Sequence, residues 1–370
     1  MPKYILSYAI VALLILTPAG MLFLDSQWDE KVEHRKAQTA FPELPKKIRN
    51  KAIKRYFTEI DKYIADTIPF RGKLISFAWD FFENADLNQD MNIALRGKDN
   101  WLFLGNNYNG ILDKLQNKIV LQEDSLKNAV ELYGAMHLFA KERKADFALL
   151  IGPNKSSVYG EYLPPTISRG KTRYLSPALK ELREKGLLVV DPTALLIESK
   201  KKGLMYYRTD THWNLLGASI AASALFKRLA LPAPQNYSLL PGPPLKGDIV
   251  AIAGYSTFPL AEGDNFLLEW EPQFNVLINE DGNTREIPGA AILDSAHRKR
   301  ISVFNKNAAT DKTVWVYTDS FGAALSPFLN ATFKEAHYLP HGDFGPGKAE
   351  PGGSSPDVII TIVVERNFLH

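Results

Sequence analysis

The sequence predicts an α/β fold with a largely parallel central sheet and helices on both faces. Two observations lead to this prediction: continuous apolar runs of strand length, and helical stretches that alternate with them. Parallel strands read as continuous apolar runs because helices cover both sides of the sheet. The 370 residues suffice for one large domain and a smaller attachment.

Residues 1–24 are predicted to form a membrane helix. Residues 4–24 carry no charged side chain and follow Lys3. At about 1.5 Å per residue, such a helix is long enough to cross a bilayer core. We interpret it as an uncleaved signal anchor, because the small-residue pattern of a cleavage site is poor, with a cleaved signal peptide as the alternative. With Lys3 in the cytoplasm, the rest of the chain is expected outside it.

Residues 25–85 are predicted to be a linker followed by N-terminal helices. The linker is charged and contains Pro42 and Pro45, which break any helix. Apolar residues then recur at three- and four-residue spacing over 53–64, and a second apolar helix is expected over 73–82.

The main domain is predicted over residues 86–370, beginning with a hairpin-like aromatic strand at 101–104. An inserted loop with an antiparallel hairpin beside the main sheet is expected at about 232–300, where turn residues separate short apolar runs. Further helices are predicted over residues 123–144, 176–185, 214–228 and 320–329, and further strands over 147–151, 187–190, 313–317 and 357–364.

Composition excludes several classes of protein. The net charge of +3 comes from 44 basic and 41 acidic residues spread along the chain, and no long single-sign block indicates nucleic acid binding. The absence of cysteine removes disulfides, thiolate metal sites and cysteine nucleophiles.

Two short segments carry candidate nucleophilic chemistry. A serine hydroxyl needs an imidazole within hydrogen-bond reach and a carboxylate that orients the imidazole. Asp210 and His212 stand two residues apart and can point to the same side of a turning backbone, while Ser320 follows the predicted strand 313–317. Because ligands bind at the carboxyl ends of parallel strands, both segments are expected at one edge of the sheet.

Other interpretations of these residues remain open. Ser320 is also a typical helix N-cap, and Asp210 with His212 is also a typical structural pair. A metal site is a third interpretation, in which the remaining ligands are drawn from a small set of residues. That set consists of His337, His341 and Asp343.

Residues next to the candidate nucleophile have predicted roles of their own. Backbone N–H groups at Ser320, Phe321 and Gly322 are candidates to stabilise an oxyanion, since a helix begins there. Asp319 is expected to shape the turn and not to serve as the carboxylate of the site. Trp213, like Trp101 and Trp270, is a candidate to stack on sugars or, alternatively, a core residue.

The two segments together carry a resemblance to a known family. Asp-Thr-His-Trp-Asn at 210–214, followed by Thr-Asp-Ser-Phe-Gly at 318–322, resembles the paired signatures of the SGNH-hydrolase-like alginate O-acetyltransferases, the AlgJ and AlgX group. The familiar Gly-Asp-Ser form of the second signature is Thr-Asp-Ser here. The layout, an N-terminal anchor with no module expected after the sheet, is closest to the AlgJ members. Similar segments occur, in order, at 63–66, 69–71, 97–103, 153–155, 159–164, 247–249 and 365–366.

The resemblance implies a function and roles for residues. Asp210 would orient His212, His212 would activate Ser320, and Ser320 would carry an acetyl group to a hydroxyl of an exported polysaccharide. Arg366 would line the pocket or bind a substrate anion. The alternatives are a carbohydrate acetylesterase, or a non-catalytic component that binds polysaccharide or assembles a secretion complex.

The resemblance also implies partners and a location. A membrane-embedded acyltransferase would supply the acetyl groups, and other exopolysaccharide biosynthesis proteins would be partners. The protein would lie in the periplasm, anchored in the inner membrane. No metal or organic cofactor is expected.

Overall fold

The computed structural model describes residues 92–255, 258–345, 348, 350–351 and 354–369. All described helices and strands fall within residues 88–252 and 257–370. The predicted membrane helix at 1–24 and the predicted linker and helices at 25–85 lie outside the described residues. Within the described part of the chain, no helix is both long and apolar enough to cross a bilayer.

The centre of the fold is an eight-stranded sheet with strand order β4-β3-β12-β10-β11-β9-β7-β8. The strands from β4 to β11 run parallel, whereas those from β11 to β8 pair antiparallel. The prediction of a largely parallel sheet is therefore wrong at one end, because the sheet is mixed. Its strands are β3 (Asp146–Gly152), β4 (Val189–Val190), β7 (Asn275–Glu280), β8 (Asn283–Pro288), β9 (Ile301–Phe304), β10 (Thr313–Thr318), β11 (Glu335–Pro340) and β12 (Val358–Val364).

The antiparallel end of the sheet comes from the segment predicted as an insertion beside it. β7 and β8 form a hairpin around Asp281 and Gly282, whose φ angles of 52° and 83° suit a tight two-residue turn. β9 joins this hairpin to β11. Exposed and buried side chains alternate at the start of β7. Such alternation is typical of antiparallel strands with one solvated face. Because β7 pairs with β9, the hairpin extends the main sheet instead of lying beside it.

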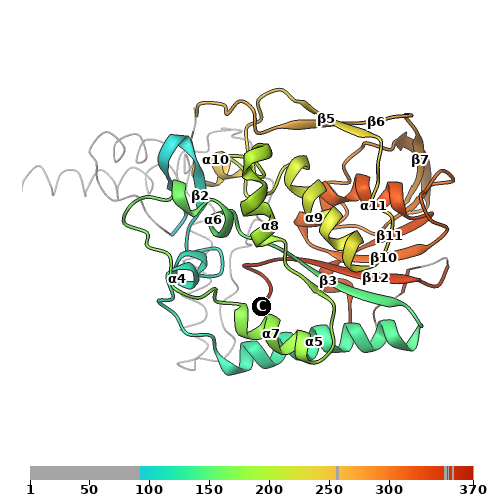
Figure 1. The fold of residues 1–370 in the computed structure, drawn as a ribbon, viewed down its shortest axis with the longest axis horizontal. Helices are drawn as coiled ribbons and strands as arrows, with labels where there is room; N and C mark the ends of the chain where they lie inside the picture. The colour runs from blue at the N-terminus through green and yellow to red at the C-terminus, as the bar shows by residue number, and fades with distance from the viewer. Residues whose placement is uncertain (1–91, 256–257, 346–347, 349, 352–353, 370) are drawn as a thin grey trace, which may run out of the picture. The chain divides into compact units, whose positions relative to one another are not determined.

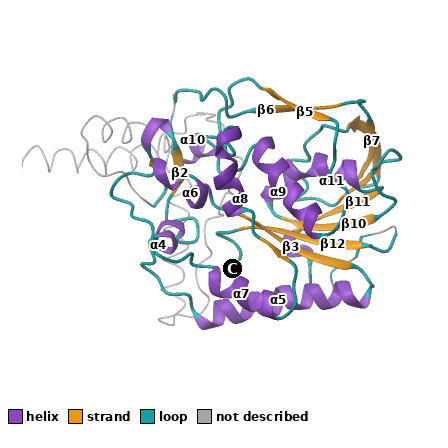
Figure 2. Cartoon of the chain, in the orientation of Figure 1, coloured by secondary structure: helices purple, strands orange, loops and turns teal. Residues whose placement is uncertain are grey.

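Helices cover both faces of the sheet, as the sequence predicts (Figure 1, Figure 2). α5 (Glu123–Glu142) and α7 (Ser176–Glu184) lie on one face. α8 (Thr193–Glu198), α9 (Leu215–Arg228) and α11 (Ser326–Thr332) lie on the other. The predicted helix at 320–329 starts as a 3₁₀ helix, Ser320–Leu325, before α11. Three shorter helices are α4 (Ile111–Leu115), α6 (Lys155–Val158) and α10 (Asp248–Ile252).

Two small hairpins lie outside the main sheet: β1 (Ala94–Arg96) with β2 (Leu102–Leu104), and β5 (Tyr237–Pro241) with β6 (Phe266–Trp270). Trp101 is 1% exposed and stacks on Tyr162 with ring centroids 4.6 Å apart. Trp270 is 6% exposed and packs on Tyr237. Both tryptophans therefore fill the core and are not free to stack on sugars.

The carboxyl ends of the parallel strands bring polar residues to one edge of the sheet. Ser320 follows β10, Arg366 follows β12, Asn154 follows β3 and Asp191 follows β4. These strands are neighbours in the sheet, in the order β4-β3-β12-β10. This edge is where open parallel sheets bind their ligands, and it carries the site described below.

The middle of β12 should tolerate truncation poorly. Ile360 is fully buried in the strand between β3 and β10. We expect Ile360→Ala to lower the free energy of unfolding by about 2–5 kcal/mol, because a cavity is left in a packed core. Leu277→Ala on β7, where Leu277 is 40% exposed, should cost less than about 1 kcal/mol. Urea unfolding measures both, and equal losses would contradict the assignment of β12 to the core.

Candidate active site

Three polar side chains form a continuous hydrogen-bonded chain at the sheet edge. His212 Nε2 lies 2.7 Å from Ser320 Oγ, and His212 Nδ1 lies 2.7 Å from Asp210 Oδ1. An ionised carboxylate only accepts hydrogen bonds, so Nδ1 donates to Asp210 and Nε2 accepts from the Ser320 hydroxyl. Ser320 and His212 remain partly exposed. The arrangement provides a serine hydroxyl with a base that is already oriented toward it.

The Asp210 carboxyl is held in its ionised form. Burial by itself would raise its pKa, but the hydrogen bond and charge of His212 and the amide of Asp248 hold the pKa of Asp210 well below its usual range. The same carboxylate also accepts a hydrogen bond from the His212 amide at 3.0 Å. This local turn is why an Asp-x-His spacing brings both side chains to one side.

The loop that carries His212 is fastened to the segment that carries Ser320. Trp213 Nε1 donates to the Phe321 carbonyl at 3.0 Å, and the two rings lie 5.0 Å apart. Asn214 then caps α9 by accepting a hydrogen bond from the Gly217 amide. Trp213 is only 1% exposed. It is therefore a structural link between the two halves of the site, and the prediction that it contacts substrate is wrong.

Asp319 shapes the turn at Ser320, as expected. Its carboxylate accepts hydrogen bonds from the Phe321 amide at 2.9 Å and the Val364 amide at 2.7 Å. The Gly322 amide donates to the Asp319 carbonyl at 3.2 Å. The Phe321 and Gly322 N–H groups are thus already used, which corrects their assignment as oxyanion donors. Among the described residues, the Ser320 N–H has no acceptor, so it is the amide of this turn that is left for an oxyanion.

The ring of Phe321 packs against the imidazole of His212. Its side chain is fully buried, and its ring centroid lies 5.2 Å from that of His212. A Cβ on Gly152 would lie 2.4 Å from the Phe321 ring, so glycine is needed there for the close approach. The ring is therefore a packing surface for the imidazole rather than a substrate contact.

Arg366 borders two cavities that share several lining residues. Its guanidinium carbon lies 5.5 Å from the Phe321 ring centroid. A cavity of about 30 Å³ is lined by Arg366 together with Lys114, Arg169 and Ser156. A second, of about 10 Å³, shares Arg366 and Ser156 and reaches Thr211. The pocket role predicted for Arg366 agrees with this position.

Two buried polar atoms in these cavities have no partner among the described residues. They are Asn154 Oδ1 and Ser156 Oγ, on side chains that are 6% and 3% exposed. A buried polar atom without a partner is costly, so a bound water or ligand group is expected there. Sequence patterns do not reveal this pocket, although Asn154 and Ser156 do follow the end of β3.

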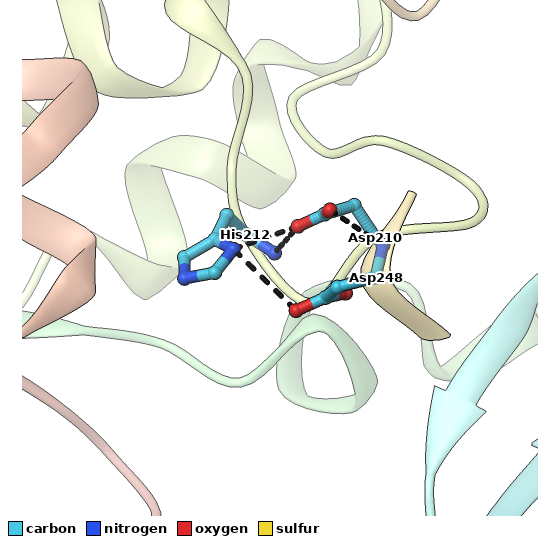
Figure 3. A group of neighbouring side chains, drawn as sticks. All are labelled: Asp210, His212 and Asp248. Carbon is cyan, nitrogen blue, oxygen red and sulfur yellow. Dashed lines mark hydrogen bonds and ion pairs between the residues drawn. The ribbon is translucent and has the colours of Figure 1, made fainter. Parts of the chain in front are cut away.

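Asp248 is a member of the site that sequence patterns do not reveal. Figure 3 shows its carboxylate beside Asp210 and His212, 3.9 Å from His212 Nδ1. Its amide donates to Asp210 Oδ2, and its carboxylate accepts from the Thr211 amide, each at 2.8 Å. Burial and the Asp210 charge raise the pKa of Asp248. The one available indication was that Gly247-Asp248-Ile249 is among the segments that carry the family resemblance.

The candidate metal ligands do not gather as the alternative interpretation requires. Asp210, His212 and Asp248 offer ligand atoms within 4.8 Å of one another, but His337, His341 and Asp343 are not in this group. His337 Nδ1 lies 2.8 Å from Ser302 Oγ, and Asp343 pairs with Arg300 at 2.8 Å. His212 Nδ1 is engaged by Asp210, so the three residues form a hydrogen-bonded network that orients His212.

Comparisons with known proteins agree with this architecture. The family described as "SGNH hydrolase-like domain, acetyltransferase AlgX" matches residues 94–256. Two curated relatives named "Probable alginate O-acetylase AlgJ" are 26% identical over 174 residues (Pseudomonas syringae pv. tomato) and 27% identical over 197 residues (Pseudomonas putida). These alignments cover 46% and 51% of this chain and 41% and 46% of the relatives, so the match spans less than half the length of each relative.

A solved structure shares the fold. The crystal structure of a DHHW family protein from Eubacterium siraeum superposes with a TM-score of 0.52 at 16% identity, over 75% of this chain and 95% of that one. The fold is accordingly α/β with a mixed central sheet, and residues 94–256 of it are similar to the SGNH hydrolase-like family.

Gly247 should not tolerate a side chain. A Cβ there would lie 2.3 Å from the Thr209 carbonyl and 2.4 Å from the Asp210 amide nitrogen. We expect Gly247→Ala to push this backbone away and to lower the free energy of unfolding by about 1–3 kcal/mol. In Gly134→Ala on α5, the new Cβ meets nothing within 4 Å, so this control should be neutral or stabilising by about 0.5–1 kcal/mol. Denaturant unfolding measures both, and equal stability of the two variants would contradict the close packing at Gly247.

Proposed function

We propose that this chain, which is similar to the AlgJ and AlgX proteins, is an O-acetyltransferase that acetylates hydroxyl groups of an exported bacterial polysaccharide, alginate or a similar exopolysaccharide. The observation that carries this proposal is the hydrogen-bonded chain from Ser320 through His212 to Asp210, with both heavy-atom distances at 2.7 Å. This is the geometry that an activated serine nucleophile requires.

The first half of the proposed reaction forms an acetyl-enzyme. His212 Nε2 takes the Ser320 proton as Oγ attacks the acetyl carbonyl of the donor. The oxyanion that develops is stabilised by the Ser320 amide, and His212 then returns the proton to the departing group. Asp210 keeps the proton of Nδ1 in place and stabilises the imidazolium.

In the second half, the acetyl group passes to the polysaccharide. An acceptor hydroxyl loses its proton to His212 Nε2, its oxygen attacks the acetyl-Ser320 carbonyl, and Ser320 leaves with the proton from His212. Water in place of the sugar would make the protein an acetylesterase by the same steps. Neither half requires a metal or an organic cofactor.

The cavity that Arg366 lines favours an anionic group of the acceptor. Lys114, Arg169 and Arg366 line the cavity, whereas the carboxylate of Glu365 at its wall is already paired with Arg173 at 2.6 Å. Guanidinium groups recognise carboxylates through charge-assisted hydrogen bonds. The carboxylate group of a uronate residue has the charge that complements this lining.

The membrane context is part of the proposal. Residues 1–24 would anchor the protein in the inner membrane, with the described domain in the periplasm. Acetyl groups would come from a membrane-embedded acyltransferase, and other exopolysaccharide biosynthesis proteins would be partners.

Ser320 should be essential for acetyl transfer. We expect Ser320→Ala to lower acetyl transfer at least about 10³-fold, because the acetyl-enzyme cannot form. Ser223→Ala is the matched control, since Ser223 lies exposed on α9 and its hydroxyl donates to the Ser219 carbonyl. Mass spectrometry after incubation with an activated acetyl ester and a uronate oligosaccharide measures both products.

The products of that experiment separate the candidate functions. Ser320-dependent acetylation of the oligosaccharide supports the transferase. Ser320-dependent release of acetate alone would identify an acetylesterase instead. If Ser320→Ala changed nothing, a binding or assembly role would replace the enzymatic one.

Arg366 should act on the acceptor more than on the chemistry. We expect Arg366→Gln to raise KM for a uronate oligosaccharide about 10- to 100-fold, since a charge-assisted hydrogen bond is lost. Hydrolysis of a small neutral acetyl ester should change less than about threefold, because that ester has no carboxylate. Steady-state kinetics with both substrates measures the difference, and an equal loss with both would contradict an acceptor role.

A further inference from the structure

A buried lysine binds the loop that carries Asp210. Lys155 is the first residue of α6 and is 4% exposed. Its Nζ donates to three main-chain carbonyls, those of Tyr207 at 3.1 Å, Arg208 at 2.9 Å and Asp210 at 2.7 Å. All three carbonyls belong to one short irregular segment, residues 207–210. The side chain therefore spans the backbone that leads directly into His212.

Three carbonyl acceptors require the charged form of this lysine. An ammonium group has three N–H donors, whereas a neutral amine has two and a lone pair. A lone pair facing a carbonyl oxygen repels it and leaves that carbonyl without a donor, at a cost typical of a buried unsatisfied group. Loss of one proton from Lys155 would thus remove one of the hydrogen bonds that hold the loop.

The surroundings of Lys155 exclude water and supply compensating charge. The rings of Trp101 and Phe103, each 1% exposed, lie 5.7 Å and 5.4 Å from Nζ and favour the cation. Burial lowers the pKa of the Lys155 ammonium to about 7, although the carboxylates of Asp210, Asp248 and Asp264 raise it. The balance brings loss of this proton close to physiological pH.

Other segments hold the same loop together with Lys155. The Arg208 carbonyl also accepts from the Leu102 amide at 2.9 Å, and the Arg208 amide donates to Asp264 Oδ2 at 2.7 Å. The Asp248 amide donates to Asp210 Oδ2. Lys155 nevertheless bonds more of the loop's carbonyls than any other side chain in the described residues.

We propose that Lys155 is a positioning residue whose ammonium holds residues 207–210, and through them Asp210 and His212, in register with Ser320, so that catalysis fails when Lys155 loses its proton. The inference rests on the proposed function, because it concerns the same site. Lys155 acts through the loop, because the hydrogen bonds of its ammonium go to the main chain of residues 207–210. A misplacement of about 1 Å in a catalytic group is enough to cost about 10²-fold in rate.

The other ionisable groups that face Lys155 do not explain an alkaline loss. The carboxylates of Asp210, Asp248 and Asp264 favour the ammonium and oppose its deprotonation. Burial raises the pKa of Tyr207 to about 12, outside the range concerned. Loss of activity between neutral pH and about pH 9 is therefore assigned to Lys155.

The first test is the pH dependence of kcat/KM for hydrolysis of a chromogenic acetyl ester by the full chain. Wild type should lose activity above neutral pH with the slope of a single proton. Lys155→Met should be about 10²-fold slower with little change in KM, and its alkaline loss should be absent. Lys155→Arg keeps the charge and should recover part of the rate without the alkaline loss. Lys180→Met, at an exposed residue of α7, should behave as wild type.

The second test needs neither a variant nor activity. Amide hydrogen exchange of wild type at pH 6.5 and pH 9, corrected for the intrinsic rate, should show at least about tenfold less protection of residues 207–213 at the higher pH. Protection of β3 and β12 should stay constant. If wild type shows no Ser320-dependent turnover, the proposed function fails, while this measurement still decides the role of Lys155. Unchanged protection of the loop, or the same alkaline midpoint in Lys155→Arg, would overturn the inference.

Discussion

The backbone of residues 207–212 is the part of the molecule on which the site depends, and its polar groups must be satisfied by other segments. It is half-buried and has no helix or strand of its own, so most of its amides and carbonyls need partners from elsewhere. Lys155 donates to three of the carbonyls, and the carboxylates of Asp264 and Asp248 accept from two of the amides. The Leu102 amide of the β1–β2 hairpin donates a further hydrogen bond. The position of His212 is therefore decided jointly by segments far apart in the chain.

The electrostatics of the site depend on several carboxylates that lie near the ammonium of Lys155. Asp210 is ionised because His212 and the Asp248 amide stabilise its charge, whereas burial and Asp210 itself raise the pKa of Asp248. Neighbouring acids whose pKa values are pushed apart divide their roles. Asp210 orients the imidazole, and Asp248 holds the loop through Thr211. The ammonium of Lys155 balances this negative charge.

The site lies at the parallel part of the mixed sheet, and the antiparallel strands extend the sheet at its other end. The parallel strands end beside one another and bring Ser320, Arg366 and Asn154 to the same edge. The antiparallel strands β9, β7 and β8 lengthen the sheet beyond β11 and contribute none of these side chains. Arg366 after β12 lies close to Phe321 after β10 because these two strands are adjacent in the sheet.

The sequence by itself determined the buried parallel strands, the helices on both faces and the residues Asp210, His212 and Ser320, because these follow from local periodicity and from short spacings along the chain. Only the tertiary structure decided that β7 and β8 extend the main sheet, that Trp213 and Phe321 are packing residues, and that the Phe321 and Gly322 amides are already bonded to Asp319. It also decided that Lys155 and Asp248 hold the loop of His212. Those roles depend on which distant segments meet and on which hydrogen bonds are already taken, and no local pattern records either.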